Sequence, residues 1–405
     1  MLESNPLPVR TPSRRGIIVL LGALAALGPF SIDTYLPAFP AIARDLGVSV
    51  GRIDFSLATY FLGICLGQLA YGPLMDRYGR RTPLLWGLGL YALASVLCAV
   101  APHDIALSAL RFLQALGGCA GMVAGRALVR DLFPAEAAQV FSSLMLVMGV
   151  APVVAPSIGG WIAAVLGWRA IFLFLALVAS ALAAVLASGL PDTHERHLEQ
   201  SFHPRDIAKG WLAVLREREF LLWGVGGSLA SGGLFAYLAG SPAAYMQGLD
   251  LSSGTYSWVF AVNAGGLIGA SQFNRWLLRR YPSGQIVRAV LVGQFLSASI
   301  LVACAGLGYP LAAFPLVWIF LFGHGLTYPN VSALAMAPFG RTAGSASALM
   351  GSLQMASGAV LAALVGILPV SPILAMAVGM LVAAAGGLAV LAAVDRQTGV
   401  VASTT

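Results

Sequence analysis

Long apolar stretches alternate with short charged or Pro/Gly-rich breaks along almost the whole chain. A helix of roughly 20 apolar residues crosses the hydrocarbon layer of a bilayer, about 30 Å at about 1.5 Å per residue. The pattern therefore predicts an all-α membrane protein with 12 transmembrane helices. The predicted spans are residues 16–37, 54–73, 84–101, 105–126, 137–162, 168–189, 220–245, 254–274, 285–305, 309–332, 342–368 and 372–394.

The composition agrees with this pattern. Of the 405 residues, 59% are hydrophobic and only 10% are charged, whereas a soluble domain carries about 25% charged residues. The formal net charge of +7 does not indicate a nucleic-acid partner, because the arginines cluster between the spans and form no polar basic surface. The lipid bilayer is therefore the main solvent of this chain.

The positive charges also predict the orientation of the spans. Cytoplasmic loops of membrane proteins are enriched in lysine and arginine. With a cytoplasmic N-terminus, 19 of the 23 lysines and arginines lie on the inner side and three, Arg44, Arg52 and Arg169, lie outside. The remaining one, Arg111, lies within the fourth span. An even number of spans then places the C-terminus in the cytoplasm as well.

The longest connector divides the chain into two sets of six spans. We expect a cytoplasmic tail at 1–15, an N-terminal six-helix half at 16–189, a cytoplasmic linker at 190–219, a C-terminal half at 220–394 and a second tail at 395–405. Two such halves suggest a parallel repeat with the substrate site between them, near the middle of the membrane.

Asp33 is the acidic residue that the pattern places inside a span. A carboxylate there is costly, by at least about 2.5 kcal/mol, unless it faces protein or water. Removal from water favours the protonated form of a carboxylate in general, so such a group could load and release a proton as a cavity opens to either side. We expect Asp33 to be the proton carrier. The alternative is that Asp33 caps a broken helix end near Pro29 and Pro37 without titrating.

Arg111 is the expected partner of Asp33, because an arginine inside a span also needs an acceptor. Gln114, three residues later on the same helical face, could extend this polar network into the cavity or form an interhelical hydrogen bond. His324 in the tenth span is a second titratable candidate, since histidine titrates near neutral pH. The pattern favours the alternative, a neutral packing residue.

A charged turn and a kinkable helix are the other candidate features. The turn between spans two and three contains Gly72, Asp76, Arg77, Gly79, Arg80 and Arg81. We expect it to act as a gating loop, and its arginines also fix the topology. The fifth span carries Gly149, Pro152, Pro156, Gly159 and Gly160 at a spacing of three and four residues. Small residues on one helical face permit close crossings in lipid.

These motifs resemble the major facilitator superfamily. Gly72-Pro-Leu-x-Asp76-Arg-x-Gly79-Arg-Arg81 is similar to its loop after span two. Arg111-Phe-Leu-Gln114 and the segment from Ala151 to Gly160 are similar to its fourth-span and fifth-span antiporter motifs, with Ala155 where glycine is usual. Ser31-Ile-Asp33-Thr-Tyr-Leu-Pro37 resembles the first helix of the bicyclomycin and chloramphenicol resistance group (Bcr/CflA).

The resemblance implies a multidrug efflux transporter of the bacterial inner membrane. It would export small, largely apolar drugs in exchange for protons by alternating access, as a monomer that uses the proton gradient and no cofactor. An aromatic substrate cavity would suit such drugs. The expected lining is Tyr35, Tyr60, Phe112, Gln114, Phe141, Phe235, Tyr237, Phe260 and Tyr328.

Other function classes find less support in the sequence. An exporter or facilitator of a small metabolite, such as an amino acid or a sugar, would have the same fold and differs only in the use made of Asp33. The chain contains no phosphate-binding loop and no HExxH motif, which argues against direct ATP drive and against an enzyme. Its four cysteines lie in apolar stretches without the spacing of a metal site, so we expect no metal and no catalytic residues.

Overall fold

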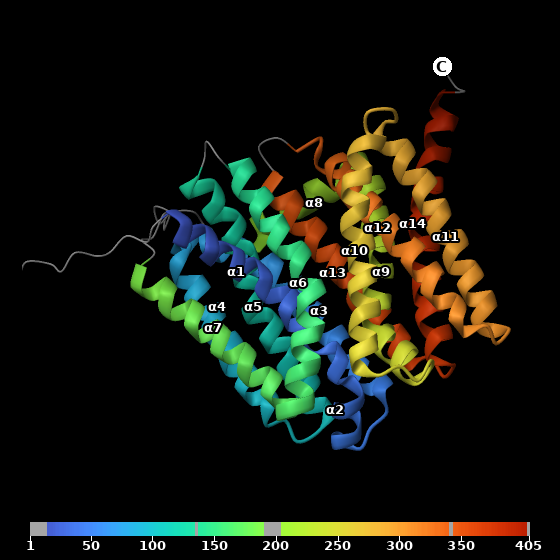
Figure 1. Ribbon diagram of the computed structural model, residues 1–405. Coiled ribbons are helices and arrows are strands. Elements are labelled where there is room, and N and C mark those ends of the chain that lie inside the picture. The colour runs from blue at the N-terminus through green and yellow to red at the C-terminus, as the bar shows by residue number, and fades with distance from the viewer. Residues whose placement is uncertain (1–13, 134–136, 190–203, 340–342, 403–405) are drawn as a thin grey trace, which may run out of the picture.

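The computed structural model describes residues 14–133, 137–189, 204–339 and 343–402, and helices are the regular elements in these ranges (Figure 1). The first half contains α1 (Arg14–Asp33), η1 (Leu36–Ala38), α2 (Phe39–Leu46), α3 (Val50–Tyr78), α4 (Arg81–Ala99), α5 (Asp104–Leu132), α6 (Ala137–Leu166) and α7 (Arg169–Gly189). The second half contains α8 (Pro204–Arg216), η2 (Phe220–Val225), α9 (Gly226–Pro242), η3 (Ala243–Gln247), α10 (Ser253–Leu277), α11 (Ser283–Gly306), η4 (Pro310–Ala312), α12 (Ala313–Met336), α13 (Ala343–Ile367) and α14 (Pro372–Ala402).

Ten helical segments of the described chain are long and apolar enough to cross a membrane. Each coincides with one of the predicted spans. The two further predicted spans, 137–162 and 254–274, fall in the helices α6 and α10, of 30 and 25 residues. Within α6, Val150–Leu166 is a further apolar helical stretch.

The helices form two bundles that meet along two seams. In the first bundle α5 packs on α3 and α4, and α1 packs on α6; in the second, α9 packs on α13 and α14, and α11 on α12. The bundles join where α3 packs against α13 and α6 packs against α10. Figure 1 shows the first bundle, in blue and green, beside the second, in yellow to red.

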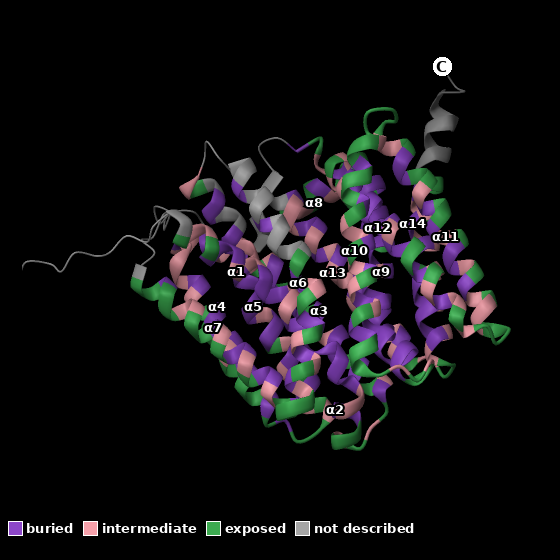
Figure 2. Cartoon of the chain, in the orientation of Figure 1, coloured by how far each residue is buried: buried purple, intermediate pink, exposed green. Residues whose placement is uncertain are grey.

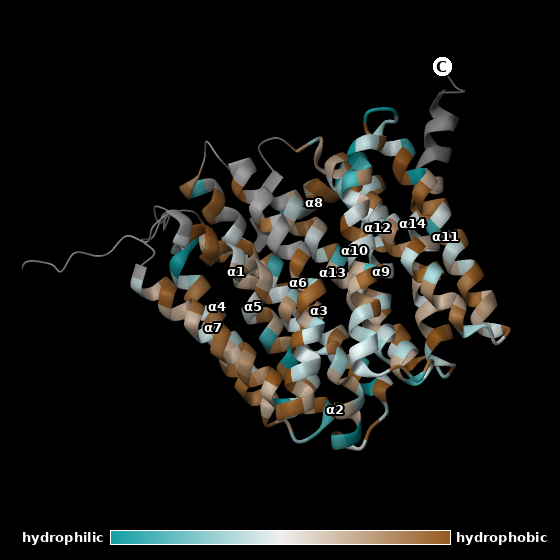
Figure 3. Ribbon diagram, in the orientation of Figure 1, coloured by the Kyte–Doolittle hydropathy of each residue, from teal (hydrophilic) through white to brown (hydrophobic). Residues whose placement is uncertain are grey.

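The outer surface of the bundles is apolar. Large side chains such as Trp86, Trp161 and Leu177 are mostly exposed. Exposed positions follow the outer faces of the helices in Figure 2, and many of these faces are hydrophobic in Figure 3. A water-soluble monomer rarely exposes apolar patches of this extent, whereas lipid solvates them. The burial pattern therefore agrees with the membrane spans.

The first span is broken where the sequence places its acidic residue. Helix α1 ends at Asp33, and the chain then turns through η1 into the short helix α2. The amide of Thr34 still donates to Phe30 O, four residues back, at 3.1 Å. The amide of Tyr35 donates instead to Ile32 O, three residues back, at 3.2 Å. Proline has no amide hydrogen to donate, so Pro37, at the start of η1, suits the beginning of the new turn.

One local prediction is wrong. The expected loop from Gly72 to Arg81 is mostly helical, because α3 continues through Pro73 to Tyr78 and α4 begins at Arg81. Only Gly79 and Arg80 form the turn, and Gly79 has φ 81°, a value that favours glycine. The linker 190–219 contains the helix α8, whose Val214 is buried against the second bundle.

Candidate functional site

Arg111 lies at the centre of the first bundle, on the second turn of α5. Its side chain is fully buried. One terminal nitrogen, Nη2, donates to the carbonyl oxygen of Ser31 at 3.0 Å, and Nη1 donates to Gln114 Oε1. The guanidinium carbon lies 4.0 Å from the ring centroid of Tyr60 and 4.6 Å from that of Tyr35. Cation–π contact of this kind stabilises a desolvated arginine.

Gln114 connects this arginine to α4. Its amide nitrogen donates to Ser95 Oγ at 2.7 Å, and Ser95 Oγ donates to Tyr91 O at 2.7 Å. The Tyr91 hydroxyl in turn bonds to Ser31 Oγ on α1. Of the two interpretations of Gln114, the structure shows the interhelical hydrogen bond. The network joins three helices and fixes the end of α1.

Asp33 is buried at the C-terminal end of α1 and is 4% exposed. Within the described part of the chain its carboxylate has no hydrogen-bond or ion-pair partner. The turn η1, which follows it, packs against α9 and α10 of the second bundle. Asp33 therefore lies next to the junction between the bundles. The carbonyl dipoles at a helix C-terminus also disfavour a negative charge there.

The expected pairing of Asp33 with Arg111 is absent. Arg111 instead points into the first bundle, where Ser31 O, Gln114 and aromatic rings surround it. Its Nε is buried without a hydrogen-bond acceptor. The capping alternative for Asp33 also finds no support among the described contacts, because no backbone amide donates to its carboxylate.

Most of the expected cavity aromatics are buried in or beside this junction. Tyr237 of α9 stacks on Phe260 of α10, with ring centroids 5.7 Å apart. The Tyr237 hydroxyl accepts a hydrogen bond from Asn263 Nδ2 at 3.1 Å. Phe235 makes an edge contact with Phe61 of α3 at 4.6 Å, which joins the two bundles.

The other expected cavity residues lie elsewhere. Phe112 is half-buried on α5, beside Arg111 in sequence. Tyr328 of α12 is 49% exposed and stacks against His324, with ring centroids 6.2 Å apart. The side chains of Phe141, Gly149 and Asp76 lie outside those that the structure describes.

Helix α6 packs tightly on the break in the first span. A Cβ atom at Gly159 would lie 1.9 Å from Thr34 O, so no side chain fits there. A Cβ atom at the next residue, Gly160, would lie 3.7 Å from Pro37 Cβ and 3.7 Å from Oγ of Ser257, which belongs to α10. Pro152 and Pro156 lie inside the helix, and Ala155 is fully buried. The glycines therefore hold α6 against the segment that carries Asp33.

The turn between α3 and α4 is tied to neighbouring helices. Arg80 Nε lies 3.3 Å from Asp131 Oδ2 on α5, and Arg81 Nη2 donates to Ala187 O on α7 at 2.5 Å. These contacts hold one end of the first bundle together. Arg77 lies with its guanidinium carbon 5.4 Å from the ring centroid of Tyr78.

A cavity of about 750 Å³ opens at the other end, beside α2. It lies between α2, α6 and the segment from η3 to α10, and its polar lining includes Arg44, Gln247 and Ser253. Of the expected site residues, Gly160 lines it. This cavity therefore adjoins the broken first span on the side of α2.

Asp54 is a buried acid that the sequence pattern placed at the edge of a span. It is 2% exposed on α3, and its Oδ1 has no hydrogen-bond partner. The span was predicted to start at residue 54, but α3 begins at Val50, one turn earlier, after the extended residue Ser49. Serine before an apolar run is a usual helix start, and this signal could have placed Asp54 inside the helix.

Comparison with known proteins gives consistent matches over most of the chain. Residues 20–363 match the family model described as Major Facilitator Superfamily. The chain is 33% identical over 396 residues to an uncharacterized MFS-type transporter, YdgK, of Bacillus subtilis (strain 168), with 95% of this chain and 97% of that protein covered. It is 33% identical over 352 residues to a bicyclomycin resistance protein homolog of Haemophilus influenzae, with 86% and 88% covered.

The fold is similar to solved transporter structures. A bacterial homolog of the human lysosomal transporter Spinster, in an inward-facing and occupied conformation, superposes with a TM-score of 0.73 at 14% identity, over 98% of each chain. At this identity the likeness concerns the fold alone.

Proposed function

The chain belongs to the Major Facilitator Superfamily, and from this premise we propose that it exports small, largely apolar drugs in exchange for protons. It is a transporter rather than an enzyme, and a multi-pass integral protein of the bacterial inner membrane. These findings confirm the family that its motifs resemble. The name of the relative in Haemophilus influenzae supports bicyclomycin-like compounds as substrates. The name of a second relative, a chloramphenicol resistance protein of Pseudomonas aeruginosa, supports chloramphenicol-like compounds.

The observation that carries the proposal is the position of Asp33. A buried carboxylate without a partner is expensive as an anion. Asp33 lies at the break in the first span, just before the turn η1, which packs against the second bundle. In the proposed cycle Asp33 takes up a proton when the junction opens to the outside and releases it when the junction opens to the cytoplasm. Drug binding between the bundles would then alternate with protonation.

Arg111 has a different part in the proposal from the one that the sequence suggested. Its hydrogen bond to Ser31 O fixes the backbone two residues before Asp33. It therefore acts as a positioning residue for the carrier, through the end of α1. Its guanidinium lies over the rings of Tyr35 and Tyr60. The positive charge also contributes to the electrostatic field around the junction.

In this proposal twelve helices, including α6 and α10, cross the membrane and both termini are cytoplasmic. The side of α2 then faces outwards, because the arginine-rich connectors lie at the opposite ends of the helices. The proton gradient supplies the energy, and the transporter works as a monomer. The aromatic pair Tyr237 and Phe260 would contact the apolar substrate.

The proposal is tested by measuring chloramphenicol efflux from proteoliposomes with an imposed proton gradient. Wild type should move the drug only while the gradient lasts, and an uncoupler should stop it. Asp33→Asn should abolish gradient-driven efflux while the protein remains inserted and monodisperse. Asp45→Asn is the matched control, because Asp45 is exposed and ion-paired with Arg169, and it should transport like wild type.

Other results would contradict parts of this proposal. Gradient-driven efflux by Asp33→Asn at the wild-type rate would remove Asp33 as the carrier. Efflux that continues in wild type without any gradient would identify a passive facilitator. If wild type moves neither this drug nor bicyclomycin, the substrate class is wrong, and small metabolites become the next compounds to test.

A further inference from the structure

The seam between α3 and α13 closes at its α2 end through direct backbone contact. A Cβ atom at Gly51 would lie 2.8 Å from Gly366 O, and one at Gly366 would lie 2.7 Å from Gly51 O. Neither position can accept a side chain without separating the two helices. Because the helices belong to different bundles, this contact forms only while the bundles are closed on the side of α2.

Asp54 lies on the same face of α3, one turn after Gly51. Its Cβ is 3.4 Å from the position that a Cβ at Gly366 would occupy. Its Oδ1 is buried and has no hydrogen-bond partner. A carboxylate ion would be costly in this place, since it has lost water and gained no donor.

Further along the seam the same pattern recurs. Gln68 Oε1 is buried without a partner beside Gly351 of α13. Between these two positions the seam also contains a formed hydrogen bond, from Ser352 Oγ to Cys65 O at 3.1 Å. Buried polar atoms of native proteins are nearly always hydrogen-bonded, so orphaned acceptors along one face indicate a surface that water reaches in another conformation.

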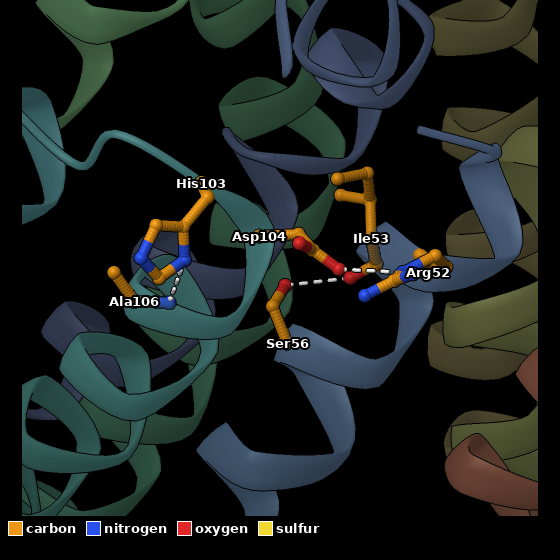
Figure 4. A network of polar contacts seen from close by, with 6 residues as sticks. All are labelled: Arg52, Ile53, Ser56, His103, Asp104 and Ala106. Carbon is orange, nitrogen blue, oxygen red and sulfur yellow. Dashed lines mark hydrogen bonds and ion pairs between the residues drawn. The ribbon is translucent and has the colours of Figure 1, made fainter. Parts of the chain in front are cut away.

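The charges near Asp54 are engaged with other groups. Arg52, two residues earlier, pairs with Asp104 Oδ2 at the start of α5, at 2.6 Å, and Figure 4 shows this pair turned to each other across the two helix ends. His103 accepts a hydrogen bond from the amide of Ala106 (Figure 4). On α2, Asp45 pairs with Arg169.

The remaining neighbours offer no counter-ion. Helix α13 has no ionisable side chain between residues 343 and 367, and the one ionisable side chain of α9 is that of Tyr237. Helix α4 carries Tyr91 and Cys98, apart from Arg81 at its far end. The groups that share the electrostatic environment of Asp54 are the hydroxyls of Tyr35 and Tyr256. Tyr35 Oη bonds to Ser56 Oγ at 2.9 Å, and Tyr256 Oη bonds to Ser241 Oγ at 2.9 Å.

We propose that Asp54 is a second proton-binding site, a latch whose protonation allows the α2 end of the α3–α13 seam to close. When the seam opens, the O–H bond of the carboxyl breaks and the proton passes to water on the α2 side. When it closes, a proton from the same side returns. The latch therefore adds no proton to the transport stoichiometry, and it makes the conformational equilibrium respond to pH on that side.

This inference rests on the alternating access of the proposed function, but its readout does not require a drug. Ser49 and Ser371 are exposed on either side of the Gly51–Gly366 contact. With the four native cysteines replaced by alanine, spin labels on Ser49→Cys and Ser371→Cys would report the distance between the bundles. The measurement is made on the full-length protein in nanodiscs.

In the wild-type background we expect the ratio of open to closed populations to rise about tenfold between about pH 5 and pH 9. Asp54→Asn, which keeps the shape of the side chain, should make the ratio independent of pH. Asp54→Ser should do the same, so that misfolding of one variant does not end the test. Asp45→Asn, at an exposed ion pair on α2, should retain the wild-type response.

Two results would overturn the latch. One is a wild-type population that does not change with pH, and the other is an Asp54→Asn variant that still responds as wild type does. A response lost in Asp33→Asn but kept in Asp54→Asn would assign the pH dependence to Asp33 instead. Failure of drug efflux in the wild type would contradict only the proposed function, because the label distance is measured without a drug.

Discussion

The guanidinium of Arg111 lies over the ring of Tyr60, with its central carbon 4.0 Å from the ring centroid. A buried cation is therefore stabilised by aromatic faces, a carbonyl oxygen and an amide, with no carboxylate among its described partners. This arrangement leaves Asp33 without a fixed positive partner. A carboxylate that is not bound in an ion pair can change its protonation state without breaking one.

Arg111→Lys tests whether the contact between the guanidinium and the Tyr60 ring matters. Lysine keeps the charge but loses the guanidinium contact with Tyr60 and one of the two hydrogen bonds. Cation–π contacts contribute about 2 kcal/mol when desolvated. We expect a lower midpoint of thermal unfolding in detergent and slower gradient-driven efflux. Arg52→Lys, at an exposed ion pair worth less than about 1 kcal/mol, should change neither. If Arg111→Lys unfolds at the same temperature as the wild type, the positive charge alone is sufficient for stability.

Hydropathy along the sequence was enough to locate the helices, but it did not predict which side chains of different helices contact one another. Each predicted span falls in a helical segment, because length and apolar composition are properties of one helix. The partner of Arg111 depends on the direction of its side chain around α5, and depth in the membrane does not determine that direction. The carbonyl of Ser31 also carries no signal in the sequence, since every residue has one.

The position of Asp54 was missed for a related reason. Its burial depends on α3 starting one turn earlier than the apolar pattern and on α13 approaching at Gly366. The first effect is local and can be derived from Ser49. The second joins residues more than 300 positions apart, and no pattern along one helix predicts it. The glycines of α6 were recognised as a close-packing stripe, but not Thr34 as the group they pack on.

Gly159→Ala should break the packing that holds α6 on the first span. Its Cβ would overlap Thr34 O, so the helix or the turn after Asp33 has to move. We expect a large loss of efflux, at least about tenfold, with insertion preserved, because a displacement of about 1 Å at a functional group can cost about two orders of magnitude in rate. Gly89→Ala is the control, since no atom lies within 4 Å of its Cβ position. Normal efflux by Gly159→Ala would show that this crossing is not required for transport.

Gly366→Val should favour the conformation that is open on the side of α2. The valine side chain would meet Gly51 O and Asp54, and the closed seam has no room for it. The spin-label pair on Ser49→Cys and Ser371→Cys should then report a longer distance at every pH. Efflux should fall, because the transporter no longer alternates. Gly306→Val, at an open position on α11, should leave the distance unchanged, and a closed seam in Gly366→Val would contradict the packing argument.

The stacked pair Tyr237 and Phe260 should determine which apolar compounds are moved. Phe260→Ala removes one ring of a pair whose centroids lie 5.7 Å apart, and an aromatic pair contributes about 0.5–1.5 kcal/mol beyond the area it buries. We expect the apparent affinity for chloramphenicol to fall by roughly three- to tenfold, since about 1.4 kcal/mol corresponds to a tenfold change. Tyr237→Phe keeps the ring and leaves only Asn263 Nδ2 without its acceptor, so it should bind the drug nearly as wild type does.

The measurement is efflux against drug concentration at a fixed proton gradient. Equal affinities in Phe260→Ala and wild type would place the substrate away from this pair, and the aromatic junction would then be packing between α9 and α10.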